Sequence, residues 1–378
     1  MTADLPWTNE RLHPYREIGD PPADEMVAAL VQDGKVPAVN ALMQHLVQNE
    51  FPIPESLPEA VRSYIDRTDD LPEWADRARI EAGERVFVRY GPHLAVILHC
   101  YSLPFCYLAS NGAQVLNLTD RLESNPTRRI LETAQLLMDV MQPGGLAGPK
   151  GRGRRTIQKV RLMHAAVRRM ARQAPGWNMA WGVPINQEDL AGTLMSFSWV
   201  GVDGLKKLGL ELSADDREAY LHCWNVAGWM LGVQRELLPG NEARATDLAQ
   251  AVARHQFGPS PAGRDLTSAL VKQTAYHLPG NVFQDLAPVM IRYFLGEQWA
   301  SWLGLQPGPS FELLTGLLRL LDVRVSELVV GSRALSRLVE LAGRKFLEAA
   351  LFIERGGNRP SFAIPQELRQ VWGVNWVG

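Results

Sequence analysis

The residues with the clearest capacity for chemistry lie in one basic helical stretch, RLMHAAVR. Arg161, His164 and Arg168 stand at positions i, i+3 and i+7, so they share one helix face. A buried histidine between two arginines is costly unless a ligand compensates it. Haem b is such a ligand, because its iron takes an imidazole and arginines neutralise its propionates. A structural histidine is the commoner role of a lone helical histidine, so spacing alone leaves both readings open.

The same helix belongs to a longer run of positive charge, with nine basic residues and no acid between Lys150 and Arg172. A solvated face is one explanation, and a patch for nucleic acid or an anionic membrane is another. Apolar residues such as Val160, Leu162 and Met163 occupy the remaining positions, which predicts a largely buried helix. The whole chain balances 39 Lys and Arg against 41 Asp and Glu. We therefore expect no nucleic-acid partner.

At this point the chain resembles the latex-clearing proteins (rubber oxygenases) and the wider group of related haem-dependent oxygenases. Arg161 to Arg168 match the Arg-x-x-His-x-x-x-Arg signature of that family. The blocks WGVPINQEDLAGTLMSFSW (Trp181 to Trp199) and CWNVAGWMLGVQRELLP (Cys223 to Pro239) are similar to its next two helices and occur in the same order. The resemblance covers roughly Trp74 to Leu305.

The resemblance implies an all-α fold, a globin-like helical core with additional N- and C-terminal helices, in one haem-binding domain over residues 1–378. It implies that His164 is the proximal ligand to the iron of haem b and that Arg161 and Arg168 surround the cofactor. Activation of O₂ is the implied chemistry, with oxidative cleavage of a C=C bond as the favoured reaction. Hydroxylation and peroxidase-like chemistry stay open.

A second helix is implied to carry the catalytic residues. The rubber oxygenases have Arg-x-x-Lys-Thr there, and the matching RILET gives Arg129, Glu132 and Thr133. Arg129 and Thr133 share a face and offer a cation and a hydroxyl donor. Glu132 replaces the lysine of the family, and it could substitute as an acid or base. The upstream glutamate of the rubber enzymes has no counterpart in 113–115, which reads Ala-Gln-Val.

The elements that must position these residues show helical spacing, and strand alternation is almost absent. We expect helices over Leu71 to Tyr90, ending before Gly91-Pro92, over Asn125 to Met141, and over Arg154 to Arg172. The glycine-rich stretch from Gly144 to Arg155 is expected to be a flexible connection between the last two.

The first residues form no secretory signal and no segment has the apolar length of a membrane span, so we expect a cytoplasmic protein. The expected partners are O₂ and a hydrophobic small molecule, smaller than polymeric rubber. A non-catalytic helical carrier of haem or lipid is the alternative. The oligomeric state is left open by the sequence.

Overall fold

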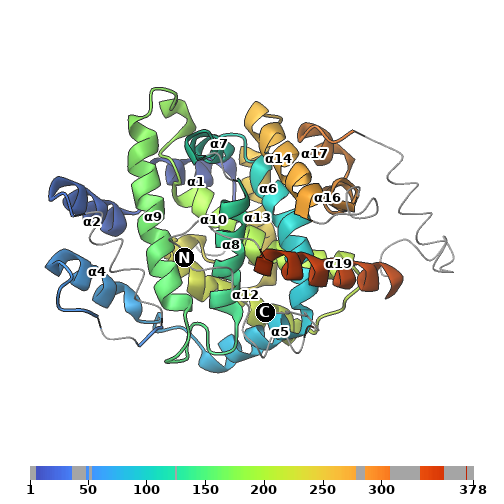
Figure 1. Ribbon diagram of the computed structural model, residues 1–378, viewed down its shortest axis with the longest axis horizontal. Coiled ribbons are helices and arrows are strands. Elements are labelled where there is room, and N and C mark those ends of the chain that lie inside the picture. The colour runs from blue at the N-terminus through green and yellow to red at the C-terminus, as the bar shows by residue number, and fades with distance from the viewer. Residues whose placement is uncertain are drawn as a thin grey trace. The chain divides into compact units, whose positions relative to one another are not determined.

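The computed structural model describes residues 6–35, 48–50, 53–123, 126–277, 286–306, 333–352 and Trp372. Within these ranges the secondary structure is helical, and β pairing is limited to one bridge between Ala109 and Phe257 (Figure 1). The expected all-α fold is therefore confirmed. The chain forms two compact units. Unit 1 contains Met1–Arg85, Leu136–Leu194 and Glu218–His255, and unit 2 contains Val86–Gln135, Met195–Arg217 and Gln256–Gly378.

The helices fall into three groups: those within unit 1, those within unit 2, and those with residues in both units. Unit 1 holds α1 (Asn9–Leu12), α2 (Pro21–Gln32), α4 (Glu59–Asp69) and α9 (Gly153–Gln173). Unit 2 holds α6 (Leu103–Leu108), α7 (Gly112–Glu123), α11 (Trp199–Lys207), α14 (Pro261–His277), α16 (Leu286–Leu295), α17 (Glu297–Trp302) and α19 (Arg333–Phe352). Residues of both units occur in α5 (Arg77–Ile97), α8 (Pro126–Met141), α10 (Gln187–Phe197), α12 (Ala214–Met230) and α13 (Glu242–Gln256).

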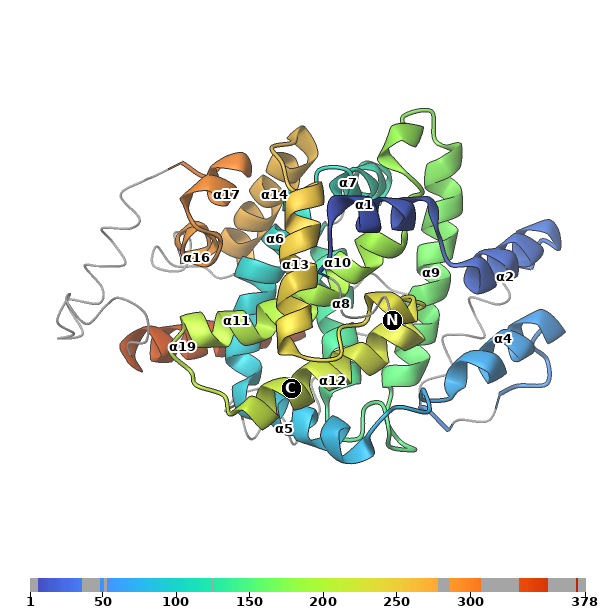
Figure 2. The same ribbon diagram turned by 180° about the vertical axis from the view of Figure 1, so that it is seen from behind.

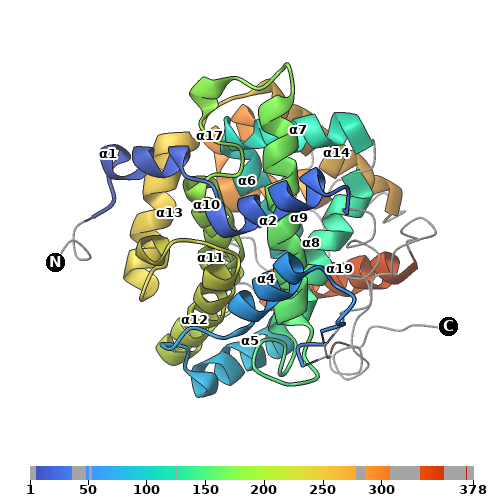
Figure 3. The same cartoon turned by 90° about the vertical axis from the view of Figure 1, so that its left-hand side faces the viewer.

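In unit 1, α2 and α4 pack side by side across α9 (Figure 3). Their apolar faces form one cluster with Ala165 of α9, to which α2 contributes Met26 and Leu30 and α4 contributes Val61 and Ile65. On another side of this unit, Asp247 of α13 accepts a hydrogen bond from the backbone of Trp7, which brings α1 beside α13 (Figure 2). The segments before α5 thus brace the helix that carries His164.

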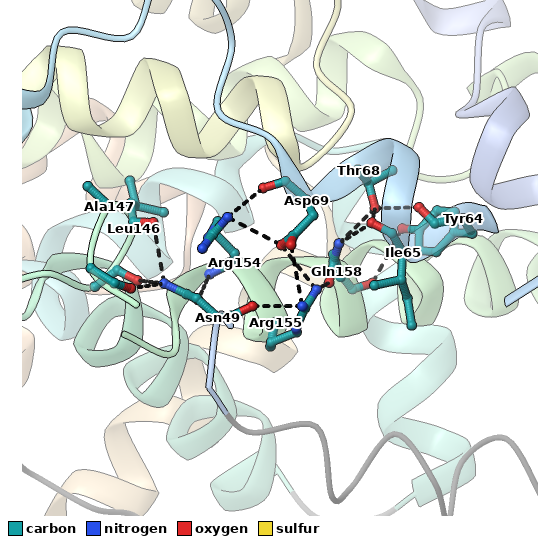
Figure 4. Close-up of polar contacts among 12 residues, drawn as sticks. Asn49, Tyr64, Ile65, Thr68, Asp69, Leu146, Ala147, Arg154, Arg155 and Gln158 are labelled. Atoms are coloured by element: carbon teal, nitrogen blue, oxygen red, sulfur yellow. Dashed lines mark hydrogen bonds and ion pairs between the residues drawn. The ribbon is translucent and has the colours of Figure 1, made fainter. Parts of the chain in front are cut away.

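The connection between α8 and α9 is packed around one buried side chain, although the sequence predicted a flexible loop. The side-chain amide of Asn49 donates to the carbonyls of Gly145 and Gly148, both at 2.9 Å, and its Oδ1 accepts from the backbone of Arg154 at 3.0 Å (Figure 4). A Cβ added to Gly151 would lie 2.1 Å from a carbonyl oxygen of the same loop, so this glycine is sterically required. The loop thereby fixes where α9 begins.

Proline does not end α5, contrary to the prediction of a stop before Gly91-Pro92. The helix runs through Pro92 to Ile97. Proline lacks the N–H that would bond the carbonyl of Val88, and the indole of Trp372 donates to that carbonyl instead, at 2.7 Å. Gly91 permits this approach, because a Cβ there would overlap the Trp372 ring. A donor remote in sequence thus replaces the lost helical hydrogen bond.

Unit 2 also contains a wide helical turn, η2 (Leu98–Ser102), between α5 and α6. The N–H of Leu103 bonds the carbonyl of Leu98, which is the five-residue spacing of a π-helix. All five residues of the turn are buried. The segment after His93 is therefore a buried helix with a π turn placed just before Pro104.

Candidate functional site

His164 lies in the middle of α9 and is half-buried, with a fully buried Nδ1. Among the described residues this nitrogen has no hydrogen-bond partner. Desolvation, reinforced by the charge of Arg168, lowers the pKa of His164 to about 4, so the ring is neutral near pH 7. Ligation of a metal requires a neutral imidazole. The half-buried ring is therefore in the protonation state that a metal ligand requires.

Arg161 forms a two-point ion pair with Asp20, just before α2. Its Nε donates to Oδ2 at 2.6 Å, and its Nη2 donates to Oδ1 at 2.8 Å. Burial alone would lower the pKa of Arg161, but the hydrogen bonds and charge of Asp20 outweigh it and raise that pKa. The guanidinium thus stays charged although only 11% of its side chain is exposed.

Arg168, two turns after Arg161 on α9, is paired in a similar way. Its Nη1 donates to Asp24 of α2 at 2.6 Å, and its Nη2 donates to the carbonyl of Ile185 at 3.1 Å. Ile185 has a positive φ of 50°, a rare conformation for a β-branched residue. Such strain persists only where the surroundings impose it, and here Arg168 holds the carbonyl of the strained residue.

Both arginines predicted to surround a haem therefore already have carboxylate partners. The ion pairs fasten α9 to Asp20 and Asp24 on the flank of His164. Gly232 packs tightly against the ion pair of Arg161 and Asp20, since a Cβ on this glycine would lie 2.6 Å from Asp20. In this structure the arginines position the helix of His164. Their pairing with propionates stays a prediction.

Sequence reasoning missed Asp20, Asp24 and a third residue, Gln187. The amide of Gln187 donates to the carbonyls of Gly19 and Gly232, both at 2.9 Å, and its oxygen accepts from the backbone of Gln234 at 2.8 Å. One signal could have found the acids: a run of nine bases without an acid needs carboxylates from elsewhere wherever it is buried.

The apolar positions of α9 do not bury the helix as expected. Met163 is 44% exposed and Met170 39% exposed, and Ala166 between them is also exposed. The burial of α9 instead comes from the face that carries Ala165 and Arg168. The helix is thus amphipathic, and its buried face includes the charged Arg155 and Arg168 beside Ala165, while Met163 and Met170 face outward.

The predicted catalytic residues lie on α8 in unit 2, whereas His164 belongs to unit 1. Arg129, Glu132 and Thr133 are each half-buried. The hydroxyl of Thr133 donates to the carbonyl of Arg129 at 2.9 Å, and Arg129 donates to the carbonyl of Leu116 at 3.4 Å. The single hydroxyl proton is therefore committed to the backbone, and Thr133 must turn before it can donate to another group. Their catalytic roles stay predictions.

The donor set decides which kind of metal centre His164 fits. Over the described residues, no group of three or more His, Cys, Asp or Glu side chains lies close enough to bind a bare ion. Haem iron takes four ligands from the porphyrin and needs one protein ligand to be held. A single histidine with a buried nitrogen and no second ligating side chain beside it therefore fits haem better than a non-haem centre. In the same part of the chain, no helix combines the length and apolarity that crossing a bilayer requires.

Residues 107–323 match the family described as ER-bound oxygenase mpaB/B'/Rubber oxygenase, catalytic domain. Over 370 residues the chain is 30% identical to the rubber oxygenase of Streptomyces sp. (strain K30), which covers 93% of this chain and 86% of that protein. Among solved structures, the latex clearing protein LCP in the closed state matches with a TM-score of 0.74 and 28% identity, over 93% of this chain and 95% of that one.

Proposed function

Because this chain belongs to the family of rubber oxygenases and related mpaB oxygenases, as its sequence blocks predicted, we propose that it is a haem b-dependent oxygenase. The proposed reaction is oxidative cleavage of a C=C bond in a hydrophobic substrate smaller than polymeric rubber. Both atoms of O₂ then enter the two carbonyl groups of the products, so no external reductant is needed.

One observation carries the proposal of haem. The imidazole of His164 is neutral and has a buried Nδ1 without a partner among the described residues. His93 and His99 share this feature, but each forms a hydrogen bond through Nε2, and His164 forms none with a described residue. Bound haem would supply iron that binds and activates O₂. The chain's own contribution would be to hold the iron through His164 and to keep that ring in place through the Arg161 and Arg168 ion pairs.

Arg129 and Thr133 are proposed to act toward O₂, as the resemblance implies. One offers a guanidinium and the other a hydroxyl, and both stabilise developing negative charge. Glu132 is proposed as the residue that distinguishes this protein from the rubber enzymes. It puts a carboxylate where the family's motif has a lysine, and a charge reversal beside two proposed catalytic groups favours a different substrate.

Product analysis tests the reaction and the size of the substrate together. Haem-loaded protein is incubated under O₂ with an unsaturated terpenoid oil and, separately, with dispersed polyisoprene, and carbonyl products are measured by mass spectrometry. We expect carbonyl products and matching O₂ uptake with the small olefin. Cleavage of the polymer alone would refute the smaller substrate. If the protein consumes no O₂ with either compound, the result would favour a non-catalytic haem carrier.

A further inference from the structure

His222 lies on α12 within unit 1, outside the candidate site, and is 9% exposed. Its Nε2 accepts a hydrogen bond from the backbone N–H of Asp76 at 3.0 Å. An amide N–H can only donate, so Nε2 must carry a lone pair and the single ring proton must lie on Nδ1. This contact therefore requires the neutral form of the histidine and selects one of its two tautomers.

Asp76 is the residue that caps the start of α5. Its Oδ1 accepts from the backbone N–H groups of Ala78 and Arg79, at 2.9 and 3.2 Å. In a capping box, a glutamate or glutamine three residues after the cap bonds the N–H of the cap residue. Arg79 occupies that position and has no acceptor atom, so His222 of a remote helix supplies the missing acceptor. The imidazole thus completes the N-terminus of α5.

The same imidazole also holds the connector 70–76, which joins α4 to α5. Its ring meets the indole of Trp74 edge to face, with the ring centroids 5.8 Å apart. The guanidinium of Arg235 lies over the Trp74 ring, 4.4 Å from its centroid. The end of the connector therefore depends on His222 through two contacts, one with an aromatic ring and one with a backbone N–H.

The charged groups near this ring come from three elements. They are Asp76 and Arg79 at the start of α5, Arg235 of η4 (Arg235–Leu237) behind Trp74, and Glu218 one turn earlier on α12. The carboxylate of Glu218 accepts from a backbone N–H of α13 at 3.0 Å. Burial lowers the pKa of His222 below 6.5, Arg79 lowers it further, and Asp76 opposes both. The neutral form that the contacts require is therefore also the form that the surroundings favour.

We propose that His222 is a proton-operated latch: its neutral ring closes the connector 70–76 and the first turn of α5, and its protonated ring releases them. Protonation adds an N–H to Nε2, which would then face the N–H of Asp76, so the hydrogen bond is lost. It also brings a positive charge to the positive end of the α5 dipole, beside Arg79. The proposal does not depend on haem, because none of these residues is assigned to the cofactor.

The direction of the switch follows from the lowered pKa of the latched ring. The released ring regains the ordinary pKa of 6.5, so the stabilisation by His222 is fully present above about pH 6.5 and is lost as the pH falls. Opening takes up one proton, so within this range each pH unit lowers the ratio of closed to open connector by about tenfold. The opening is expected to stop at Asp69, because its carboxylate stays paired with Arg154 and Arg155 of α9 at 3.5 and 3.0 Å (Figure 4).

Hydrogen exchange followed by mass spectrometry tests the proposal on the full-length protein after incubation with hemin. Protection factors of the backbone amides are compared between about pH 7.5 and about pH 5. We expect the segment 70–80 to lose protection by about tenfold for each pH unit below 6.5, while α4 keeps its protection. In His222→Gln, an amide oxygen that does not titrate can accept from Asp76, so we expect no such loss.

Two further variants make the test specific to this ring. Arg79→Gln removes an exposed charge that lowers the pKa of His222, so the same segment should open at a higher pH. His13→Gln changes an exposed histidine elsewhere in unit 1 and should behave as the unaltered protein. Glu84 titrates in the same pH range in every variant, so comparison with His222→Gln removes its effect. Constant protection in the unaltered protein, or an equal loss in His222→Gln, would overturn the proposal, and so would an unshifted transition in Arg79→Gln.

Discussion

Arg161 and Asp20 form a buried two-point ion pair, with Nε and Nη2 of the arginine at 2.6 and 2.8 Å from the two carboxylate oxygens. This pair joins the helix of His164 to the segment before α2. Removing one partner of a buried ion pair strands the other charge, which costs far more than losing an exposed pair. The relationship therefore links the stability of unit 1 to the position of the proposed haem ligand.

The variant Asp20→Asn tests this link. It leaves Arg161 buried without a counter-charge, and we expect the free energy of unfolding to fall by about 3–5 kcal/mol. Asp33→Asn is the control, because Asp33 pairs with Lys35 at the surface and should cost less than about 1 kcal/mol. Urea unfolding followed by circular dichroism measures both. Equal losses in the two variants would contradict a structural role for the buried pair.

The hydroxyl of Thr133 is predicted to act in turnover and not in folding. We expect Thr133→Val to retain its haem and to slow O₂ uptake by about tenfold or more, because a donor toward O₂ is lost. Thr246 on α13 also donates to the carbonyl one turn back, so Thr246→Val removes the same kind of backbone bond elsewhere. Its rate should be unchanged. An unaltered rate in Thr133→Val would remove that residue from the catalytic set.

Glu84 gives unit 1 a pH-dependent stability. It is buried, and one carboxylate oxygen accepts from the N–H of Gly144 at 2.9 Å. Burial raises the pKa of Glu84 from 4.5 to about 7, with a smaller contribution from Glu81 in the same direction and opposition from the Gly144 hydrogen bond and from Arg85. Because the folded pKa is raised, the folded state holds the proton more tightly than the unfolded chain.

The contribution of Glu84 to the free energy of unfolding is therefore predicted to be greatest below about pH 4.5. It falls as the pH rises toward 7 and levels off above that pH. Glu84→Gln should remove a loss of about 3 kcal/mol between these limits. Glu73→Gln, an exposed change elsewhere in unit 1, should leave the profile unchanged. Unfolding free energies measured across this pH range decide the matter, and parallel profiles for the unaltered protein and Glu84→Gln would refute the assignment.

The Trp372 indole is predicted to stand in for the hydrogen bond that Pro92 cannot make. Trp372→Phe should leave the carbonyl of Val88 without a donor and cost about 1–3 kcal/mol. In a Pro92→Ala background the new amide can donate to Val88, so the same change should cost about 1 kcal/mol less. A double-mutant cycle measures this coupling. Strict additivity would show that the indole and the missing amide are unrelated.

Local sequence patterns predicted the helices well where the determinants are local. The predicted helix from Arg154 to Arg172 agrees with α9 within one residue at each end, because helical spacing and the flanking glycines specify it. The stop at Pro92 was wrong because the compensating donor, Trp372, lies far along the chain. Proline rules describe a helix alone, and tertiary contacts override them.

At the candidate site, too, the sequence predicted what local spacing determines and missed what tertiary packing determines. The sequence predicted His164 and its two arginines as site residues through their spacing on one helix, and that assignment stays a prediction, whereas the family resemblance is confirmed. It could not reveal Asp20 or Asp24, since no local pattern joins them to α9. Nor could it show which cations of α9 lie inside, because burial of that helix depends on the packing of α2 and α4.

The central claim is that His164 holds the haem. The direct measurement is the pyridine haemochrome and absorption spectrum of purified protein, after incubation with hemin, for the unaltered chain, His164→Ala and the control His13→Ala, an exposed histidine. We predict a Soret band and near one haem b per chain in the first and third, and loss of haem in His164→Ala. Full haem content in His164→Ala, with the same spectrum, would contradict the account.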